Sequence, residues 1–130
     1  MPTKNEYYNI KTKDNVIVLT FMKDAVDKEE NISLSTEVSN KLIEIFDKKI
    51  NSCVIIDLVA LKNDLKMPRK SRQAYAKMSK HKNLKKVAVV TDNIYIKVIG
   101  KSILFITGRD KGAYRVFGKK TEALKWVNNS

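Results

Sequence analysis

The first third of the chain has a pattern of apolar and polar residues that predicts a hairpin followed by a helix. Residues 6–11 and 16–21 resemble two strands on either side of a Lys-Asp-Asn turn. Residues 24–33 are polar and acidic, so we expect a loop there. From Leu34 onward apolar residues recur at helical spacing as far as Lys48-Lys49, a pair of cations suited to the carboxyl end of a helix dipole.

The remainder of the chain alternates predicted strands and helices. Residues 53–58 form an unbroken apolar run, which is typical of a central strand covered on both faces. The stretch from 94 to about 106 is rich in β-branched residues, as strands are, but its length and single apolar arc favour a helix. The other predicted elements are a helix over 67–80 with Pro68 in its first turn, a strand over 86–91, a strand over 114–117 and a helix over 118–127.

These elements predict an α/β fold with the order ββαβαβαβα. Strands that alternate with helices are usually parallel and joined by right-handed crossovers, so we expect a mixed five-stranded sheet with helices packed on it. The 130 residues fit one domain, and we expect its ordered core to span about 6–127. A hydrophobic content of 43% with four glycines and two prolines is typical of a globular chain.

Three places in the sequence resemble a known family. Residues 54–58 (Val-Ile-Ile-Asp-Leu) look like a central strand that ends in Asp-Leu, and residues 86–90 look like the strand that follows it. Residues 114–117 (Tyr-Arg-Val-Phe) and 122–127 (Glu-Ala-Leu-Lys-Trp-Val) resemble a closing signature of Arg-Val-Phe and then Glu-Ala-Leu-x-Trp-Leu. On these residues the chain resembles the STAS/SEC14 group, and specifically the small SpoIIAA-like bacterial proteins. The resemblance implies a STAS-type fold used as a regulatory or ligand-binding module.

The resemblance does not extend to a phosphorylation switch. Anti-sigma-factor antagonists of this fold carry a phosphorylatable serine after an aspartate at the start of the second helix. The nearest stretch here is Asp64-Leu65-Lys66, which lacks that serine. Ser71 lies further along, on the inward face of the predicted helix, where a phosphate would have to displace packed side chains.

Positive charge is concentrated in the middle of the chain. The formal net charge is +12, and the segment from Lys62 to Lys86 contributes +9 of it, with ten lysines and arginines and one acid, Asp64. On the helix predicted over 67–80, one face is apolar or small and the other is cationic. The cationic face is formed by Arg69, Lys70, Arg72, Lys77 and Lys80, and the inward face by Met67, Ser71, Ala74, Tyr75 and Met78.

Two explanations of this cationic face remain open: a solvated helix surface, or a surface for an anionic partner. Because so few acids accompany the bases, like charges repel, and this favours a partner. An acidic protein or an anionic membrane surface fits the charge. Nucleic acid is less favoured, because Tyr75, the one aromatic residue of the helix, faces inward and no reader motif occurs.

The helix predicted to end near Ile106 has more apolar surface than a surface helix normally buries. Either neighbouring helices cover the surplus, or it lines an apolar-ligand pocket or a dimer surface. The SEC14-like resemblance implies the pocket, for a lipid or another apolar molecule. The residues of this surface are Tyr95, Val98, Ile99 and Phe105.

Candidate catalytic and metal-binding residues are few. Cys53 is the only cysteine and lies in an apolar strand, so we expect a buried, unreactive thiol. His81 stands among lysines with no acid near it in sequence, and we expect it at the surface. The four acids at 24, 27, 29 and 30 lack the spacing of a calcium loop, and no glycine-rich phosphate loop occurs. We expect no catalytic residue, no metal and no cofactor.

The sequence therefore favours a non-enzymatic regulatory or interaction module with a basic helix for an acidic or anionic partner. A carrier or sensor of an apolar ligand under the third helix is the alternative, and non-specific nucleic-acid binding is the second alternative. The N-terminus lacks the apolar core of a signal peptide, and no run approaches the ~20 apolar residues of a membrane span. We expect a cytoplasmic protein.

Overall fold

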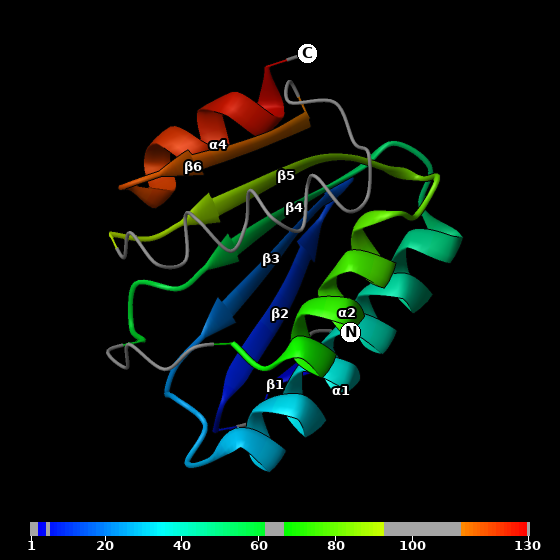
Figure 1. Ribbon diagram of the computed structural model, residues 1–130. Helices are drawn as coiled ribbons and strands as arrows, with labels where there is room; N and C mark the ends of the chain where they lie inside the picture. Colours follow the sequence, from blue (N-terminus) through cyan, green and yellow to red (C-terminus); the bar gives the residue numbers. More distant parts are fainter. Residues whose placement is uncertain (1–2, 5, 62–66, 93–112, 130) are drawn as a thin grey trace.

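The computed structural model describes residues 3–4, 6–61, 67–92 and 113–129, which form a mixed sheet with helices on both faces (Figure 1). The strands lie side by side in sequence order, from β1 at one edge to β6 at the other. The strands are β1 (Thr3–Lys4), β2 (Tyr8–Lys13), β3 (Val16–Phe21), β4 (Ser52–Asp57), β5 (Leu84–Val90) and β6 (Tyr114–Phe117). The described helices are α1 (Lys28–Lys48), α2 (Arg69–Ser79) and α4 (Lys120–Asn128).

The predicted α/β fold and its five strands are confirmed. β2 and β3 form the expected antiparallel hairpin, whose two-residue turn places Asp14 at φ 54°, a conformation that aspartate tolerates. From β3 to β6 each strand is parallel to its neighbour, as the alternation of strands and helices predicts. The short strand β1, which the sequence pattern does not indicate, pairs with β2 and extends the sheet to six strands.

The helix α1 begins earlier than the apolar periodicity indicates, so the predicted loop over 24–33 is wrong from Lys28 onward. The Asp27 carboxylate accepts a hydrogen bond from the Glu30 backbone N–H at 2.8 Å, and the Glu30 carboxylate accepts one from the Val26 N–H at 2.9 Å. Acidic residues stabilise the amino end of a helix through such caps and through the helix dipole. The polar segment is therefore a helix start.

Two hydrophobic cores lie on opposite faces of the sheet because successive side chains of a strand point to opposite sides. The core beneath α1 and α2 takes Ile17 and Leu19 from β3 and Val54 and Ile56 from β4. The core beneath α4 takes the alternate positions Cys53 and Ile55, together with residues of β5, β6 and α4. β4 therefore is the doubly covered central strand that its unbroken apolar run predicts.

The boundaries of the last helices differ slightly from the predicted ones. Pro68 is the N-cap residue of α2 and lies just before its first turn, and α2 ends at Ser79. The closing helix α4 begins at Lys120 and not at Gly118. Among the described residues, no helix is both long enough and apolar enough to cross a bilayer.

Candidate functional site: the basic surface of α2

A polar seam holds α2 against α1, and Figure 1 shows the two helices side by side on one face of the sheet. The Ser71 hydroxyl donates a hydrogen bond to Asn31 Oδ1 at 2.6 Å, and Ser71 is fully buried. Tyr75 packs against the same core, and burial raises the pKa of its hydroxyl, while a hydrogen bond with Ser35 opposes that rise. The inward face predicted for α2 is thus confirmed at Ser71, Tyr75 and Met78.

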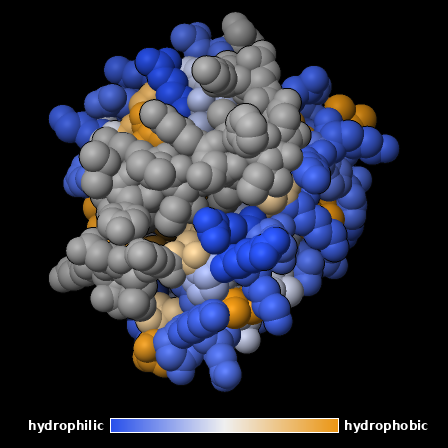
Figure 2. All heavy atoms as spheres, viewed as in Figure 1, coloured by the Kyte–Doolittle hydropathy of each residue, from blue (hydrophilic) through white to orange (hydrophobic). Residues whose placement is uncertain are grey.

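The opposite face of α2 carries the predicted cations, here called the basic surface. Arg69, Lys70, Lys77 and Lys80 are exposed, and Arg72 is half-buried. Figure 2 shows that the described surface on the side of α1 and α2 is mostly hydrophilic. The structure therefore places all five residues on or beside one exposed helix face.

The cations of the basic surface are not neutralised within the described parts of the chain. Among the described residues, the ion pair that involves a lysine or arginine joins Lys23 to Glu6. Both residues are far from α2 in sequence. The Nε atom of Arg72 is buried without a hydrogen-bond partner among the described residues. Within the described ranges, the cations of this face therefore have no carboxylate partner.

The arrangement of these charges opposes the stability of α2. No acidic residue lies in its first turn, no side chain caps its amino end, and Arg69 and Lys70 stand at the positive end of the helix dipole. Arg69 with Arg72, and Lys77 with Lys80, are like charges at the i, i+3 spacing that brings side chains together. Each such contact costs a few tenths of a kcal/mol.

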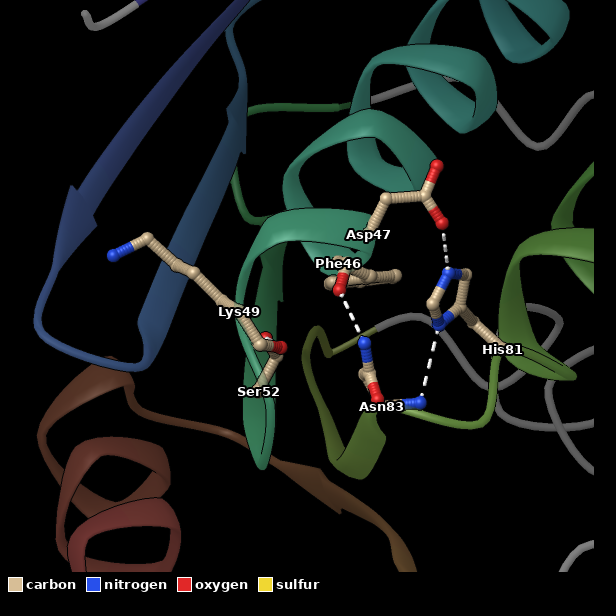
Figure 3. A network of polar contacts seen from close by, with 6 residues as sticks. All are labelled: Phe46, Asp47, Lys49, Ser52, His81 and Asn83. Atoms are coloured by element: carbon tan, nitrogen blue, oxygen red, sulfur yellow. Dashed lines mark hydrogen bonds and ion pairs between the residues drawn. The ribbon is translucent and has the colours of Figure 1, made fainter.

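A second polar cluster, which the sequence pattern does not reveal, surrounds His81 (Figure 3). The imidazole Nε2 lies 2.7 Å from Asp47 Oδ1, and Nδ1 accepts a hydrogen bond from the backbone N–H of Asn83 at 3.1 Å. The ring packs edge-on against Phe46, with 5.6 Å between centroids, and the His81 side chain is only 11% exposed. The prediction of a surface histidine is therefore wrong.

The cluster ties together the ends of four elements. The Asn83 amide donates to the Phe46 carbonyl at 2.7 Å, and the Asn83 carbonyl accepts from the Ser52 backbone N–H at 2.8 Å. The Ser52 hydroxyl donates to the Lys49 carbonyl at 2.6 Å. These bonds join the end of α1, the start of β4 and the turn from α2 into β5.

The hydrogen bonds also define the tautomer of His81. Because Nδ1 accepts from the Asn83 N–H, the tautomer that fits these contacts carries its proton on Nε2, the nitrogen that faces Asp47. Both ring nitrogens are thus engaged by the protein itself, in an arrangement that fits a structural role. Asp47 lies 34 residues before His81, so no local sequence signal could have indicated this pair.

Cys53 and Lys86 lie beneath and beside α4. Burial raises the pKa of the Cys53 thiol, and the nearby Lys86 partly offsets this, in agreement with the buried thiol expected from the sequence. The Lys86 ammonium donates to the carbonyls of Trp126 (3.0 Å) and Asn129 (2.6 Å) and lies over the Trp126 ring. This lysine of the basic segment therefore caps the end of α4 and is not part of the basic surface.

Within the ranges that the structure describes, no group of three or more histidine, cysteine or acidic side chains could hold a metal ion. Of the acids at 24, 27, 29 and 30, Asp27 and Glu30 are committed to the start of α1. The other predicted site, the apolar surface of Tyr95, Val98, Ile99 and Phe105, lies outside the described residues.

The fold is SpoIIAA-like. The structure is similar to the crystal structure of an uncharacterized protein of the DUF3478 family with a SpoIIAA-like fold from Shewanella loihica PV-4. The TM-score is 0.56 at 15% sequence identity, and the match covers 92% of this chain and 91% of that one. The resemblance drawn from the strand and closing-helix residues is thus confirmed for the fold.

Comparisons at the level of sequence add no further relationship. No model of a known protein family matches the sequence. No curated protein matches it either.

Proposed function

We propose that this protein is a non-enzymatic regulatory or interaction module of the STAS type that binds an acidic protein through the basic surface of α2. One observation carries the proposal: α2 contains four cations and no acid, a fifth cation, Lys80, is its C-cap residue, and none of the five is in an ion pair within the described chain. Such a surface attracts anionic partners over distances of a Debye length. The buried thiol of Cys53 is consistent with a reducing, cytoplasmic setting.

An acidic protein fits this surface better than a bilayer or a nucleic acid. A helix that lies in a membrane interface needs large apolar residues beside its cations, and the exposed positions of α2 are lysine, arginine and glutamine. Single-stranded nucleic acid needs aromatic rings for stacking, and Tyr75 is turned toward the core. The catalytic alternative receives no support from His81, whose ring nitrogens are both engaged.

The proposal is tested with poly-L-glutamate as the acidic probe. The double variant Lys70→Glu/Lys77→Glu reverses two exposed charges of α2, and Lys119→Glu/Lys125→Glu is its control, because it makes the same change of net charge at exposed positions around α4. We expect the α2 variant to weaken binding about tenfold more than the control, which corresponds to ~1.4 kcal/mol. Wild-type binding should also weaken steeply with salt.

Equal weakening by the two variants would show that net charge alone attracts the probe, and the basic surface would lose its assigned role. Vesicles containing phosphatidylserine and single-stranded DNA serve as competing probes. The choice of an acidic protein would be contradicted if the protein bound either of these probes more tightly than poly-L-glutamate at the same salt concentration, and if that binding were weakened by Lys70→Glu/Lys77→Glu.

A further inference from the structure

A groove of about 740 Å³ lies between the β2–β3 hairpin and α4. It is on the face of the sheet opposite to α1 and α2, because Val16 and Val18 in its wall alternate with Ile17 and Leu19 of the first core. The groove is therefore separate from the basic surface. Its lining includes Lys11, Lys13, Asp14, Val16, Val18, Lys120 and Leu124.

The floor of the groove is apolar. Val16 and Val18 of β3 and Leu124 of α4 are half-buried and pack against the second core. They leave part of their apolar surface open in the groove. A hydrocarbon group laid on this floor would be removed from water, which is favourable in proportion to the area covered.

The rim of the groove is cationic. Lys11 and Lys13 extend from β2 and Lys120 from the first turn of α4, all three exposed and none in an ion pair within the described residues. One acid, Asp14, also lines the groove, and its backbone carbonyl accepts a hydrogen bond from Lys49 at 2.9 Å. Three lysines against one carboxylate give the rim a net positive charge.

The geometry points to a binding site for a small amphipathic anion, with its hydrocarbon part on Val16, Val18 and Leu124 and its acidic head among the three lysines. The volume lies in the range of small-molecule sites, which combine an apolar lining with a few placed polar groups. The described residues of the lining include no aromatic ring on which a nucleotide base could stack. This inference does not depend on the proposed partner of α2.

Decanoate is the probe, and its binding to isotope-labelled full-length protein is followed by amide chemical shifts. We expect the shifts to concentrate on β2, β3 and α4, and decylammonium, which has the opposite head charge, to bind at least tenfold more weakly. Inorganic sulfate should also bind more weakly, because it cannot cover the apolar floor. Shifts centred elsewhere, or equal binding of decanoate and decylammonium, would overturn the assignment.

Two variants make the test specific to the groove. Lys11→Glu/Lys13→Glu should weaken decanoate binding at least tenfold, whereas Lys70→Glu/Lys77→Glu, with the same change of net charge on the other face, should leave it unchanged. Val18→Thr, which gives β3 a second threonine beside Thr20, should weaken decanoate several-fold and leave sulfate unaffected. Equal losses of decanoate binding in the two lysine variants would contradict the proposal. It would also be contradicted if a short helical peptide of leucine and glutamate displaced decanoate at a concentration lower than that of decanoate, because the groove would then be a site for a protein segment.

Discussion

At the scale of single residues, His81 shows how one side chain can hold the ends of several elements together. Its two ring nitrogens bind Asp47 and Asn83, and its ring contacts Phe46. These partners become neighbours only when α1, α2 and β5 are assembled. The sequence surrounding His81 consists of lysines and polar residues, so the local pattern indicates an exposed position, and the burial of the ring comes from tertiary structure.

We predict that His81→Ala lowers the free energy of unfolding by about 1–3 kcal/mol. The substitution removes the acceptor of the part-buried Asn83 N–H, and a buried polar group without its partner costs about that much; it also removes the contact with Asp47, whose side chain is exposed and adds little. Lys82→Ala, at the exposed neighbouring position, is the control and should change stability by less than ~0.5 kcal/mol. Urea denaturation measures both, and equal effects would show that the His81 cluster does not stabilise the fold.

Tyr114 provides a prediction about alkaline pH. Burial raises the pKa of its hydroxyl from the ordinary value of 10.0 to about 12, so the folded protein holds this proton more tightly than the unfolded chain. The stabilisation is complete below pH 10 and is lost as the pH rises from 10 to about 12. Tyr114→Phe should therefore lose less stability than the wild type across this window, by up to roughly 2 kcal/mol.

The Tyr114 hydroxyl is buried without a hydrogen-bond partner among the described residues, so its removal should not destabilise the protein at pH 7. Thermal denaturation of both proteins at several pH values between 7 and 12 makes the comparison. The burial of the hydroxyl would be contradicted if the two stability curves remained parallel above pH 10.

At the scale of elements, the sequence was most informative where the apolar pattern was strong, either as an unbroken run or at helical spacing. The central strand β4 and the two-faced helix α2 follow directly from their patterns. The start of α1 does not, because Asp27, Glu29 and Glu30 stabilise a helix end by capping and by charge, without apolar periodicity. A search for an acidic capping residue followed by glutamate would have found it.

The cations at the start of α2 allow a test of whether they are present for stability or for binding. Lys70→Glu replaces a cation by an anion at the positive end of the helix dipole, so we expect the free energy of unfolding to rise by about 0.3–1 kcal/mol. Poly-L-glutamate binding should weaken in the same variant. A stability gain coupled to a binding loss is typical of residues kept for function.

Lys48→Glu is the matched control, since it makes the same charge change at the carboxyl end of α1, where the dipole favours a cation. It should lower stability slightly. If Lys70→Glu lowered stability and Lys48→Glu did not, the cations of α2 would make favourable contacts within the protein. Their presence would then be explained without an anionic partner.

At the scale of the whole molecule, the unbroken apolar run of β4 predicts a sheet covered on both faces, and the order of elements predicts largely parallel strands; both are present. The groove could not be predicted from the sequence, because it depends on how far α4 extends across its face of the sheet. On that face α4 leaves β2 and β3 partly uncovered. The described residues therefore present a positive feature on each face of the sheet: the basic surface of α2 on one, and the groove beside α4 on the other.

The central claim is that the charge of α2, and not the overall charge of +12, recruits an acidic partner. The most direct measurement is a map of backbone amide shifts on titration of the wild-type protein with poly-L-glutamate at physiological salt. We predict that the largest shifts lie in residues 69–80. Shifts of equal size around Lys28, Lys48 and Lys125, which are exposed lysines outside both the basic surface and the groove, would contradict the claim, because they would show that every exposed lysine attracts the polymer alike.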